Sequence, residues 1–351
     1  MRRLNYAQAI LEATDQCLAK DKSVYIMGLG VTDPKGIFGT TLGLGKKYRN
    51  RVMDMPVAEN GMTGVAIGTA LVGMRPILTH QRVDFMILSL DQIINNAAKW
   101  HYMFGGKMKV PIVIRMIIGR GWGQGPQHSQ NLNSIFAFIP GLKVVMPTTA
   151  YDAKGLLISA IEDDNPVLFI EHRWLYGVSS YVPKKIYREP LGKAKIVKRG
   201  KDITIVSSSY MVLEAIRASG KLKKDGINAE VIDLRTIRPL DEKSIIESVT
   251  KTGRLLVVDG AWRSFSIAAE VIALVAEKKC GIFKAKPKRI TFPDTPVPSS
   301  PALAKYYYPR AIDIVNSVRH IFNLPKTSAK ETQMLSDIPL DVPDKTFTGP
   351  F

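Results

Sequence analysis

The sequence predicts an α/β protein made of two doubly wound units. Three observations carry this prediction: short apolar runs rich in β-branched residues recur, helical patterns lie between them, and the alternation breaks once, near residues 177–200. The chain has 351 residues, which is enough for two domains of ordinary size. With 46% hydrophobic and 23% charged residues, its composition is that of a globular protein with a large core.

In the first unit, four runs are predicted as buried parallel strands because they are short, continuous and apolar. They are residues 23–27, 110–115, 142–146 and 166–170. Helices are predicted over residues 84–104, which Gly105-Gly106 ends, and over 149–163. Small residues recur over residues 61–73, which predicts a further helix that can pack closely against a neighbour.

From residue 177 to about residue 200, prolines and charges replace the periodicity, and we interpret this stretch as a link containing a hairpin. The second unit follows, with strands predicted at 203–207, 228–233, 254–259 and 288–292 and helices at 210–222, 241–250 and 267–277. The expected domains are therefore 1–178 and 201–324, joined by a linker at 179–200 and followed by a tail at 325–351.

Several classes of protein are not expected from the composition. The two cysteines, Cys17 and Cys280, lie far apart, which argues against a disulfide framework or a zinc site and favours a reducing compartment. No histidine forms a metal-binding pair with a carboxylate at helical spacing. The N-terminus lacks the apolar core of a signal peptide, and no apolar run reaches the roughly 18 residues of a membrane helix. We therefore expect a cytoplasmic protein that does not bind a membrane.

The net charge of +18 is the unusual feature of the composition. Lysines and arginines are spread along the whole chain, and the densest clusters, at 221–224 and 278–288, lack interleaved aromatic residues. We interpret the charge as a generally basic surface and do not expect nucleic-acid binding. The alternatives are a specific acidic partner and a non-catalytic, basic binding protein.

Two segments are candidates for chemistry. The first, Met55-Pro56-Val57-Ala58-Glu59-Asn60-Gly61, follows a predicted strand and precedes the glycine-rich helix, where open α/β sheets bind ligands. A surface glutamate in a loop is the alternative interpretation of Glu59.

The second candidate is Gln127-His128-Ser129-Gln130, which follows the glycine-rich loop at residues 119–126. A histidine behind such a loop can move a proton near neutral pH. A histidine that only completes a hydrogen bond in the core is the alternative. The loop fits neither dinucleotide nor P-loop spacing.

At these motifs the chain resembles a known family, the β subunits of thiamine-diphosphate-dependent 2-oxo acid dehydrogenase first components, which act on pyruvate, branched-chain 2-oxo acids or acetoin. The matching pieces include AENGMTGVAIGTALVGMRPI, DF, QHSQ, PGLKVVMPTTAYDAKG and LYG, and in the second unit VIDLRTIRPLD and PSSPALAKYYYP. The resemblance reaches to about residue 322. It implies a pyrimidine-binding, transketolase-like domain followed by a transketolase C-terminal-like domain.

The resemblance also implies roles for matched residues. Glu59 corresponds to the glutamate that bonds N1′ of the aminopyrimidine, a bond that favours the imino form able to deprotonate C2 of thiamine diphosphate. Phe85 corresponds to the aromatic residue against that ring, and His128 to a histidine that moves protons near the substrate. In some members, backbone oxygens hold a potassium ion; the corresponding positions here are Ile112, Ala160, Ile161, Asp163 and Asn165.

The family's magnesium-pyrophosphate signature, GDG followed by a paired asparagine, is absent from this chain. In two-chain members it lies on the α subunit. The resemblance therefore implies an α partner that holds most of the Mg²⁺ site, and an α2β2 assembly. A dihydrolipoyl acyltransferase is a further expected partner, although like charges would oppose docking of this basic chain onto a basic acyltransferase domain.

Three departures from the family pattern bear on the substrate. His80-Gln81-Arg82 replaces more apolar residues, Met116-Ile117-Ile118 replaces a Gly-Pro-Asn turn, and a glycine pair is missing near Ser264-Phe265-Ser266. We predict that His80, Gln81 and Arg82 flank the mouth of the active site and favour a hydroxylated or anionic acceptor. The alternative is sequence drift at a surface or interface that has no bearing on the acceptor. The leading function is oxidative decarboxylation of a 2-oxo acid with acyl transfer to lipoamide. The alternative is a two-chain, transketolase-like enzyme that transfers a two-carbon unit to a sugar or aldehyde.

Overall fold

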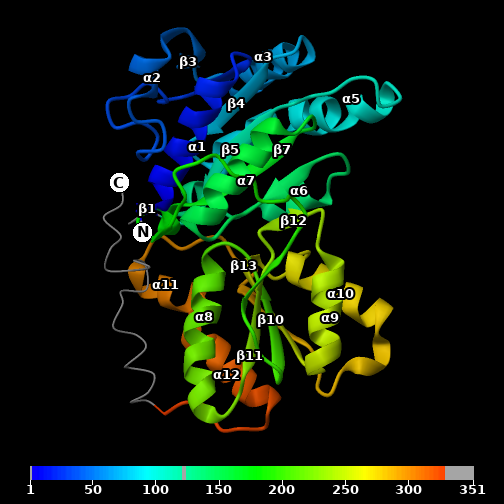
Figure 1. Ribbon diagram of the computed structural model, residues 1–351. Coiled ribbons are helices and arrows are strands. Elements are labelled where there is room, and N and C mark those ends of the chain that lie inside the picture. Colours follow the sequence, from blue (N-terminus) through cyan, green and yellow to red (C-terminus); the bar gives the residue numbers. More distant parts are fainter. Residues whose placement is uncertain (1, 121–123, 329–351) are drawn as a thin grey trace. The chain divides into compact units, whose positions relative to one another are not determined.

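The computed structural model describes residues 2–120 and 124–328, which form two compact units (Figure 1). Among these residues, the first unit contains 2–120 and 127–191, and the second contains 124–126 and 192–328. The predicted loop at 119–126 is described except for Gly121, Trp122 and Gly123, which lie outside the described residues. Of the predicted tail, 325–351, residues 329–351 also lie outside the described residues.

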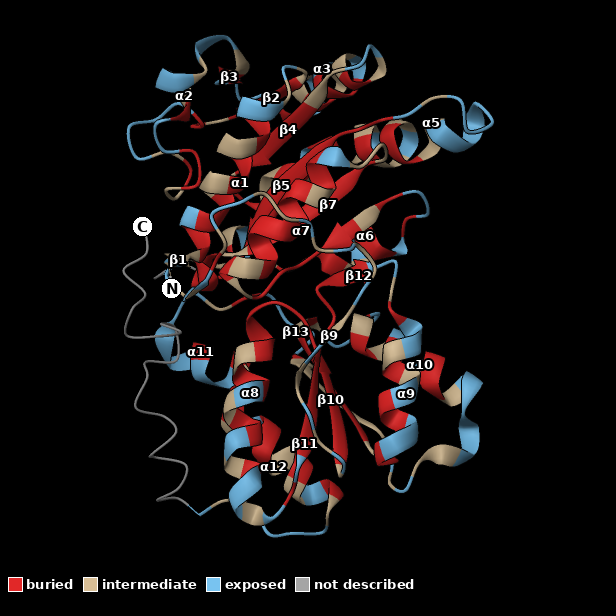
Figure 2. Cartoon of the chain, viewed as in Figure 1, coloured by how far each residue is buried: buried red, intermediate tan, exposed pale blue. Residues whose placement is uncertain are grey.

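The first unit is built on a parallel sheet with the strand order β6-β7-β5-β4-β2-β3. Its strands are β2 (Val24–Gly28), β3 (Val52–Met53), β4 (Arg75–His80), β5 (Val113–Ile118), β6 (Lys143–Val145) and β7 (Val167–His172). All residues of β2 and β5 are buried, as expected for a sheet covered on both faces (Figure 2). The four predicted strands are confirmed, with β5 beginning three residues later than expected. Strand β4 was not predicted.

Helices cover this sheet in two layers, with α1 packed against α7 and α3 packed against the helical segments between residues 87 and 97. The helices of the first unit are α1 (Tyr6–Lys20), α2 (Leu44–Lys47), α3 (Glu59–Leu71), α4 (Val83–Met86), α5 (Ala98–Met103), α6 (Asn133–Phe138) and α7 (Ala150–Glu162). Thr149 caps α7 because its hydroxyl accepts a hydrogen bond from the backbone N–H of Asp152. The predicted helices at 61–73 and 149–163 are confirmed.

The single long helix predicted over residues 84–104 is wrong. The structure has α4, a 3₁₀ turn at Ile87–Ser89, a π-helical segment at Gln92–Ala97 and then α5. These types differ in their backbone hydrogen bonds, while their side-chain periods are similar. The apolar pattern therefore predicts a helical path without distinguishing its breaks.

The hairpin predicted between the units is also wrong. Strand β8 (Ser179–Tyr181) pairs with β1 (Arg3–Asn5), and β9 (Lys195–Lys198) pairs antiparallel with β11 (Ala229–Asp233). Each of these strands takes a partner that is distant in sequence, so local turn signals could not predict the pairing.

The second unit contains a sheet with the order β14-β13-β10-β11-β9, in which β14, β13, β10 and β11 are parallel. Its remaining strands are β10 (Ile203–Ser207), β13 (Leu255–Trp262) and β14 (Lys288–Phe292), and β12 (Thr236–Arg238) is a short further strand. Figure 1 shows α8 (Tyr210–Leu222) and α12 (Ala311–Ile321) on one side of the sheet, with α9 (Glu242–Thr252) and α10 (Ile267–Lys278) on the other. The strands and helices predicted for this unit are confirmed, whereas β12, α11 (Pro301–Tyr307) and α12 were not predicted.

Over residues 2–120 and 124–328, no helix is both long enough and apolar enough to cross a lipid bilayer. Both cysteines are free thiols, Cys17 buried and Cys280 exposed.

Candidate active site

Glu59 is the first residue of α3, which begins six residues after β3 ends. The residue is buried, with 7% of its surface exposed. A carboxylate in the first turn is favoured by the helix dipole, which helps to hold a charge in this sheltered position. Within the described part of the chain, no hydrogen bond reaches the carboxylate of Glu59. Its oxygens can therefore accept a hydrogen bond from a bound molecule.

The first turn of α3 is joined to the segment that carries Phe85. The hydroxyl oxygen of Thr63 lies 2.7 Å from the carbonyl oxygen of Glu59 and 2.9 Å from the hydroxyl oxygen of Ser89. Thr63 and Ser89 are both buried, so these contacts are shielded from water. They bring the turn that follows α4 beside the start of α3.

Phe85 and His128 lie together although 43 residues separate them in the sequence. Their ring centroids are 5.3 Å apart and the ring planes meet at 87°, an edge-to-face contact. Phe85 belongs to α4, and His128 ends a short 3₁₀ turn at Pro126–His128. Both side chains are half-buried, so their free faces can contact a ligand.

Two further polar residues support this pair. The Nε2 of Gln130 donates to the Oδ1 of Asp84 at 2.7 Å. Burial raises the pKa of the Asp84 carboxyl, while Gln130, Arg82 and His128 oppose this rise. Sequence reasoning did not assign Asp84 or Gln130 a role. Their positions beside Phe85 and His128 in the motifs DF and QHSQ were the available signal.

His80, Gln81 and Arg82 lie at the carboxyl end of β4. His80 and Arg82 are only 2% and 4% exposed. Arg82 donates through Nη1 to the carbonyl oxygen of Gly119 at 2.9 Å, and Gln81 donates to the carbonyl oxygen of Leu29 at 3.0 Å. Burial lowers the pKa of His80 to about 4, so its imidazole is neutral at physiological pH. His80 and Arg82 therefore lie inside the first unit and Gln81 is half-buried, and their place at the mouth of the active site stays a prediction.

The five residues predicted to hold potassium gather where α7 ends and near the starts of β5 and β7. Arg75 donates through Nη1 to the carbonyl oxygens of Ile161 and Asp163, at 3.1 and 2.9 Å. The carbonyl oxygens of Ile112 and Ala160 accept backbone N–H groups. Each carbonyl has a second lone pair, so oxygen-only coordination is compatible with these bonds, but the ion would lie near a guanidinium charge.

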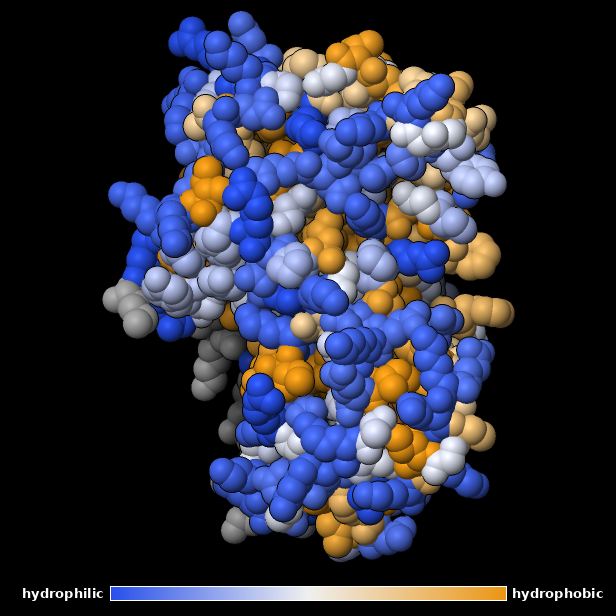
Figure 3. Space-filling model, turned by 45° about the vertical axis from the view of Figure 1, so that its right-hand side comes forward, coloured by the Kyte–Doolittle hydropathy of each residue, from blue (hydrophilic) through white to orange (hydrophobic). Residues whose placement is uncertain are grey.

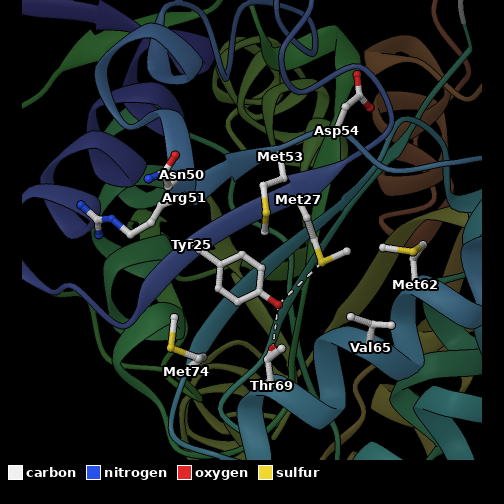
Figure 4. A pocket seen from close by; sticks show the side chains of 10 residues that line it. All are labelled: Tyr25, Met27, Asn50, Arg51, Met53, Asp54, Met62, Val65, Thr69 and Met74. Carbon is white, nitrogen blue, oxygen red and sulfur yellow. Dashed lines mark hydrogen bonds between the residues drawn. The ribbon is translucent and has the colours of Figure 1, made fainter.

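A separate cavity of about 330 Å³ lies between β2, β3 and α3 (Figure 4). Its lining residues are Tyr25, Met27, Asn50, Arg51, Met53, Asp54, Met62, Val65, Thr69 and Met74. The Tyr25 hydroxyl lies 2.7 Å from that of Thr69, and Asp54 accepts backbone N–H groups of Gly30 and Met55. The polar groups of Tyr25, Thr69 and Asp54 are thus engaged within the chain, and four of the other lining residues are flexible methionines. This cavity suits apolar side chains of another protein better than a charged ligand.

Among the described residues, no group of three His, Cys, Asp or Glu side chains could hold a metal ion. Figure 3 shows that hydrophilic side chains dominate the face in view and that hydrophobic ones form small separate groups, in keeping with the net charge of +18. The site thus offers a carboxylate acceptor, an aromatic face and an imidazole, which suits a nitrogen heterocycle and a proton transfer. These residues form no cradle for a metal-bound pyrophosphate.

Comparison with protein families gives two matches that together span most of the chain. Residues 2–178 match the transketolase pyrimidine-binding domain, and residues 192–314 match the transketolase C-terminal domain. Glu59, Phe85 and His128 all fall within the first match.

Curated relatives match over almost their whole length. The β subunit of the acetoin:2,6-dichlorophenolindophenol oxidoreductase of Cupriavidus necator is 46% identical over 91% of this chain and 97% of its own. The β subunit of the pyruvate dehydrogenase E1 component of Rickettsia bellii is 40% identical over 91% and 98%. The β subunit of the 2-oxoisovalerate dehydrogenase of Bacillus subtilis is 42% identical over 88% and 95%.

Among solved structures, a split-gene transketolase, described as an inactive β4 tetramer, aligns with a TM-score of 0.76. The alignment covers 92% of this chain and 100% of that one, at 23% identity. At this identity the likeness shows the fold alone.

Proposed function

The chain belongs to the family of β subunits of thiamine-diphosphate-dependent 2-oxo acid and acetoin dehydrogenase first components, and from that premise we propose that Glu59, Phe85 and His128 form its half of the active site. The observation that carries this proposal is the state of Glu59. It is buried in the first turn of α3, and no hydrogen bond from residues 2–120 or 124–328 occupies its carboxylate.

Thiamine diphosphate, when bound, supplies the nucleophilic carbon and the electron sink that cleavage of a 2-oxo acid or of acetoin requires. Glu59 would accept a hydrogen bond from the aminopyrimidine ring, and Phe85 would pack against that ring. Both residues fit the group, because a sheltered carboxylate and a half-buried aromatic face lie on segments that Thr63 and Ser89 join. A carboxylate in such a site bonds more strongly than one in water.

His128 would hold or move a proton beside the reacting carbon. Its edge-to-face contact with Phe85 fixes the imidazole next to the ring that packs on the cofactor. Asp84 lies within electrostatic reach of His128, whose interaction with it lowers the pKa of the Asp84 carboxyl and so opposes the rise caused by burial. The Gln130–Asp84 hydrogen bond in turn fixes the carboxylate.

An α subunit would complete the site and supply most of the ligands for Mg²⁺ and the pyrophosphate, and we propose an α2β2 assembly. The apolar cavity between β2, β3 and α3 supports a subunit contact there, and Val65 and Val72 on and just after α3 are 52% and 81% exposed. Potassium at the carbonyls around Asp163 remains a secondary proposal. A rise in thermal stability with K⁺ but not with Na⁺ would support it, and equal effects would exclude it.

The relatives act, by their names, on acetoin, pyruvate or 2-oxoisovalerate, and their identities of 40–46% are too close to select one donor. We propose that the donor is acetoin or a small 2-oxo acid, with acyl transfer to the lipoyl group of an acyltransferase as the onward step. The two free thiols support a reducing compartment, and we propose the cytoplasm.

Glu59→Gln tests the central role in the complex with the α subunit. Replacing a charge-assisted hydrogen bond by a neutral one costs about 1.5 kcal/mol or more, so exchange of the C2 proton of bound thiamine diphosphate should slow about ten-fold or more. Glu242→Gln is the matched control, because Glu242 also begins a helix, α9, but is exposed. Equal exchange rates in Glu59→Gln and wild type would refute the role.

A further inference from the structure

The start of α4 is tied to the end of the neighbouring strand. Arg82 is the residue before α4, and it is only 4% exposed. Its Nη1 donates to the carbonyl oxygen of Gly119, directly after β5, at 2.9 Å. Because β4 and β5 are hydrogen-bonded neighbours, this side chain joins two strand ends at the edge where open α/β sheets bind ligands. The bond therefore holds the first turn of α4, which carries Asp84 and Phe85.

The segment that accepts this bond is itself held from the next strand, β7, which pairs with β5 on its other side. The indole N–H of Trp174, two residues after β7, donates to the carbonyl oxygen of Arg120 at 2.6 Å. A Cβ at Gly119 would lie 2.6 Å from the ring of His172, so the backbone passes directly beside that ring. Contacts from β7 thus make this segment a fixed point of attachment for Arg82.

An aromatic ring supports the guanidinium group of Arg82. The guanidinium carbon lies 5.9 Å from the ring centroid of Phe38. The backbone of Phe38 has a φ of +49°, which is an unfavourable conformation for a residue with a bulky side chain. A glycine would adopt this φ without strain, so the presence of phenylalanine indicates that the ring is required in this place.

The position of α4 determines the position of His128. Phe85 meets His128 edge to face, with 5.3 Å between the ring centroids, and Asp84 accepts a hydrogen bond of 2.7 Å from Gln130. Helix α4 has only four residues, and so short a helix is not held rigidly by its own hydrogen bonds. The contact made by Arg82 at its start therefore decides where Phe85 and Asp84 lie, and these two residues hold the segment that contains His128.

Stability alone does not account for an arginine at this position. Burying a guanidinium group costs free energy, and replacing buried charges by well-packed apolar side chains is often neutral or stabilising. Residues 80–82 also form one of the departures from the family pattern, which has more apolar residues there. A role in placing α4 explains why the chain carries a buried arginine whose donor reaches Gly119.

We propose that Arg82 is a positioning residue, which holds the start of α4 against the carbonyl group of Gly119 and so keeps His128 beside the reacting carbon. It works through Phe85 and Asp84 and does not touch the cofactor. This inference rests on the proposed function and deepens it by adding a residue to the site. Fixing Gly119 from β7 is part of the same arrangement.

Turnover and activation of the cofactor are measured separately, in the complex with the α subunit, thiamine diphosphate and Mg²⁺. Arg82→Met keeps the apolar part of the side chain and removes its donors. Its kcat in ferricyanide reduction should fall about ten-fold or more, because a displaced group at the reacting centre slows the reaction. Exchange of the C2 proton, which in the proposed function depends on Glu59 and not on His128, should stay within about two-fold. Arg82→Lys keeps a charged donor and should recover most of the loss.

Arg254→Met is the matched control in the second unit. Arg254 also donates to a backbone carbonyl group, that of Asp202 at 3.4 Å, and its guanidinium carbon lies 4.4 Å from the ring centroid of Phe322. Its kcat should stay within about two-fold of the wild type. Added to His128→Ala, Arg82→Met should lower turnover by no more than about a further two-fold, because substitutions that act through one group are not additive.

A second variant and a second measurement cover the case in which Arg82→Met does not assemble. Trp174→Phe keeps an aromatic ring but loses the N–H that bonds the carbonyl group of Arg120, and it should give the same pattern of kcat and C2 exchange. Amide hydrogen exchange requires no turnover. In either variant, α4 and residues 128–131 should exchange about ten-fold faster than in the wild type, while β10 and β13 of the second unit stay unchanged.

Three results would overturn the inference: a parallel fall in C2 exchange and turnover, losses that multiply in the His128→Ala background, or an unchanged kcat in both variants. Turnover by the wild type together with unchanged amide exchange in Arg82→Met would also overturn it, and would leave the proposed function standing. Faster exchange confined to α4 and residues 128–131, in a complex without cofactor-dependent turnover, would support the positioning role and refute the proposed function.

Discussion

Glu171→Gln should weaken the sheet of the first unit at its centre. Arg115 on β5 and Glu171 on β7 form an ion pair whose side chains are both 0% exposed. The carboxylate accepts two hydrogen bonds from Arg115 and one from the Tyr176 hydroxyl at 2.9 Å. Removing one partner of a buried pair leaves an uncompensated charge and costs about 3 kcal/mol or more. That free energy corresponds to a roughly 100-fold rise in the population of the locally opened state.

Hydrogen exchange followed by mass spectrometry measures this effect strand by strand, without requiring the two units to unfold together. Protection of the amides in β5 and β7 should fall roughly 100-fold in Glu171→Gln. The control is Asp164→Asn, which removes a 39% exposed carboxylate that pairs with both Lys109 and Arg75, and it should change protection by less than about five-fold, corresponding to at most about 1 kcal/mol. Replacing both members of the buried pair by methionine should restore most of the protection. Unchanged protection in Glu171→Gln would refute the argument.

Three further predictions concern single residues. Burial holds the pKa of His80 at about 4, below its ordinary 6.5, so the unfolded chain binds the proton first as the pH falls. The free energy of unfolding should therefore decrease by about 1.4 kcal/mol per pH unit between pH 6.5 and 4 because of this residue. His80→Phe should reduce this dependence of the unfolding free energy on pH, and an unchanged dependence would contradict the argument. Gly119→Ala should lower Tm further than Gly39→Ala. Both glycines have positive φ, but a Cβ at Gly119 would lie 2.6 Å from the ring of His172, whereas the space around Gly39 is open. Equal melting temperatures of the two variants would contradict this steric argument. Gln130→Ala should raise the pKa of Asp84, because it removes a hydrogen bond that lowers this pKa. The acidic limb of the dependence of kcat/KM on pH should then move to higher pH. An unchanged acidic limb would show that ionisation of Asp84 does not affect turnover.

The elements with strong, uninterrupted patterns could be predicted closely from the sequence. Strand β10 and helix α8 begin and end where their patterns predict, because a continuous apolar run and an amphipathic period leave little choice. Strand β4 was missed because it begins with Arg75-Pro76 and ends with Thr79-His80. Thr79 and His80 are buried because β2 and β5 flank the strand, and this pairing is not visible in the local sequence.

The candidate site also contains residues that the sequence could indicate and contacts that only the folded chain shows. Glu59, on its own pattern, is compatible with a surface loop, and only the family resemblance gave it a role. The pairing of Gln130 with Asp84 and the approach of Arg82 and Arg173 to the ring of Phe38 depend on strand order, since the sheet and not the sequence spacing brings these residues together. Arg82 was singled out because it departs from the family pattern, and its burial against Phe38 and its hydrogen bond to Gly119 could not be predicted from that departure.

The central claim is that this chain contributes Glu59 to an active site that an α subunit completes. The most direct test is ferricyanide reduction by the co-expressed complex with thiamine diphosphate and Mg²⁺, with acetoin, pyruvate or 2-oxoisovalerate as donor. We expect reduction with at least one donor by the complex, and none by either chain alone or by the complex carrying Glu59→Ala. Turnover that survives Glu59→Ala, or that this chain performs by itself, would contradict the claim.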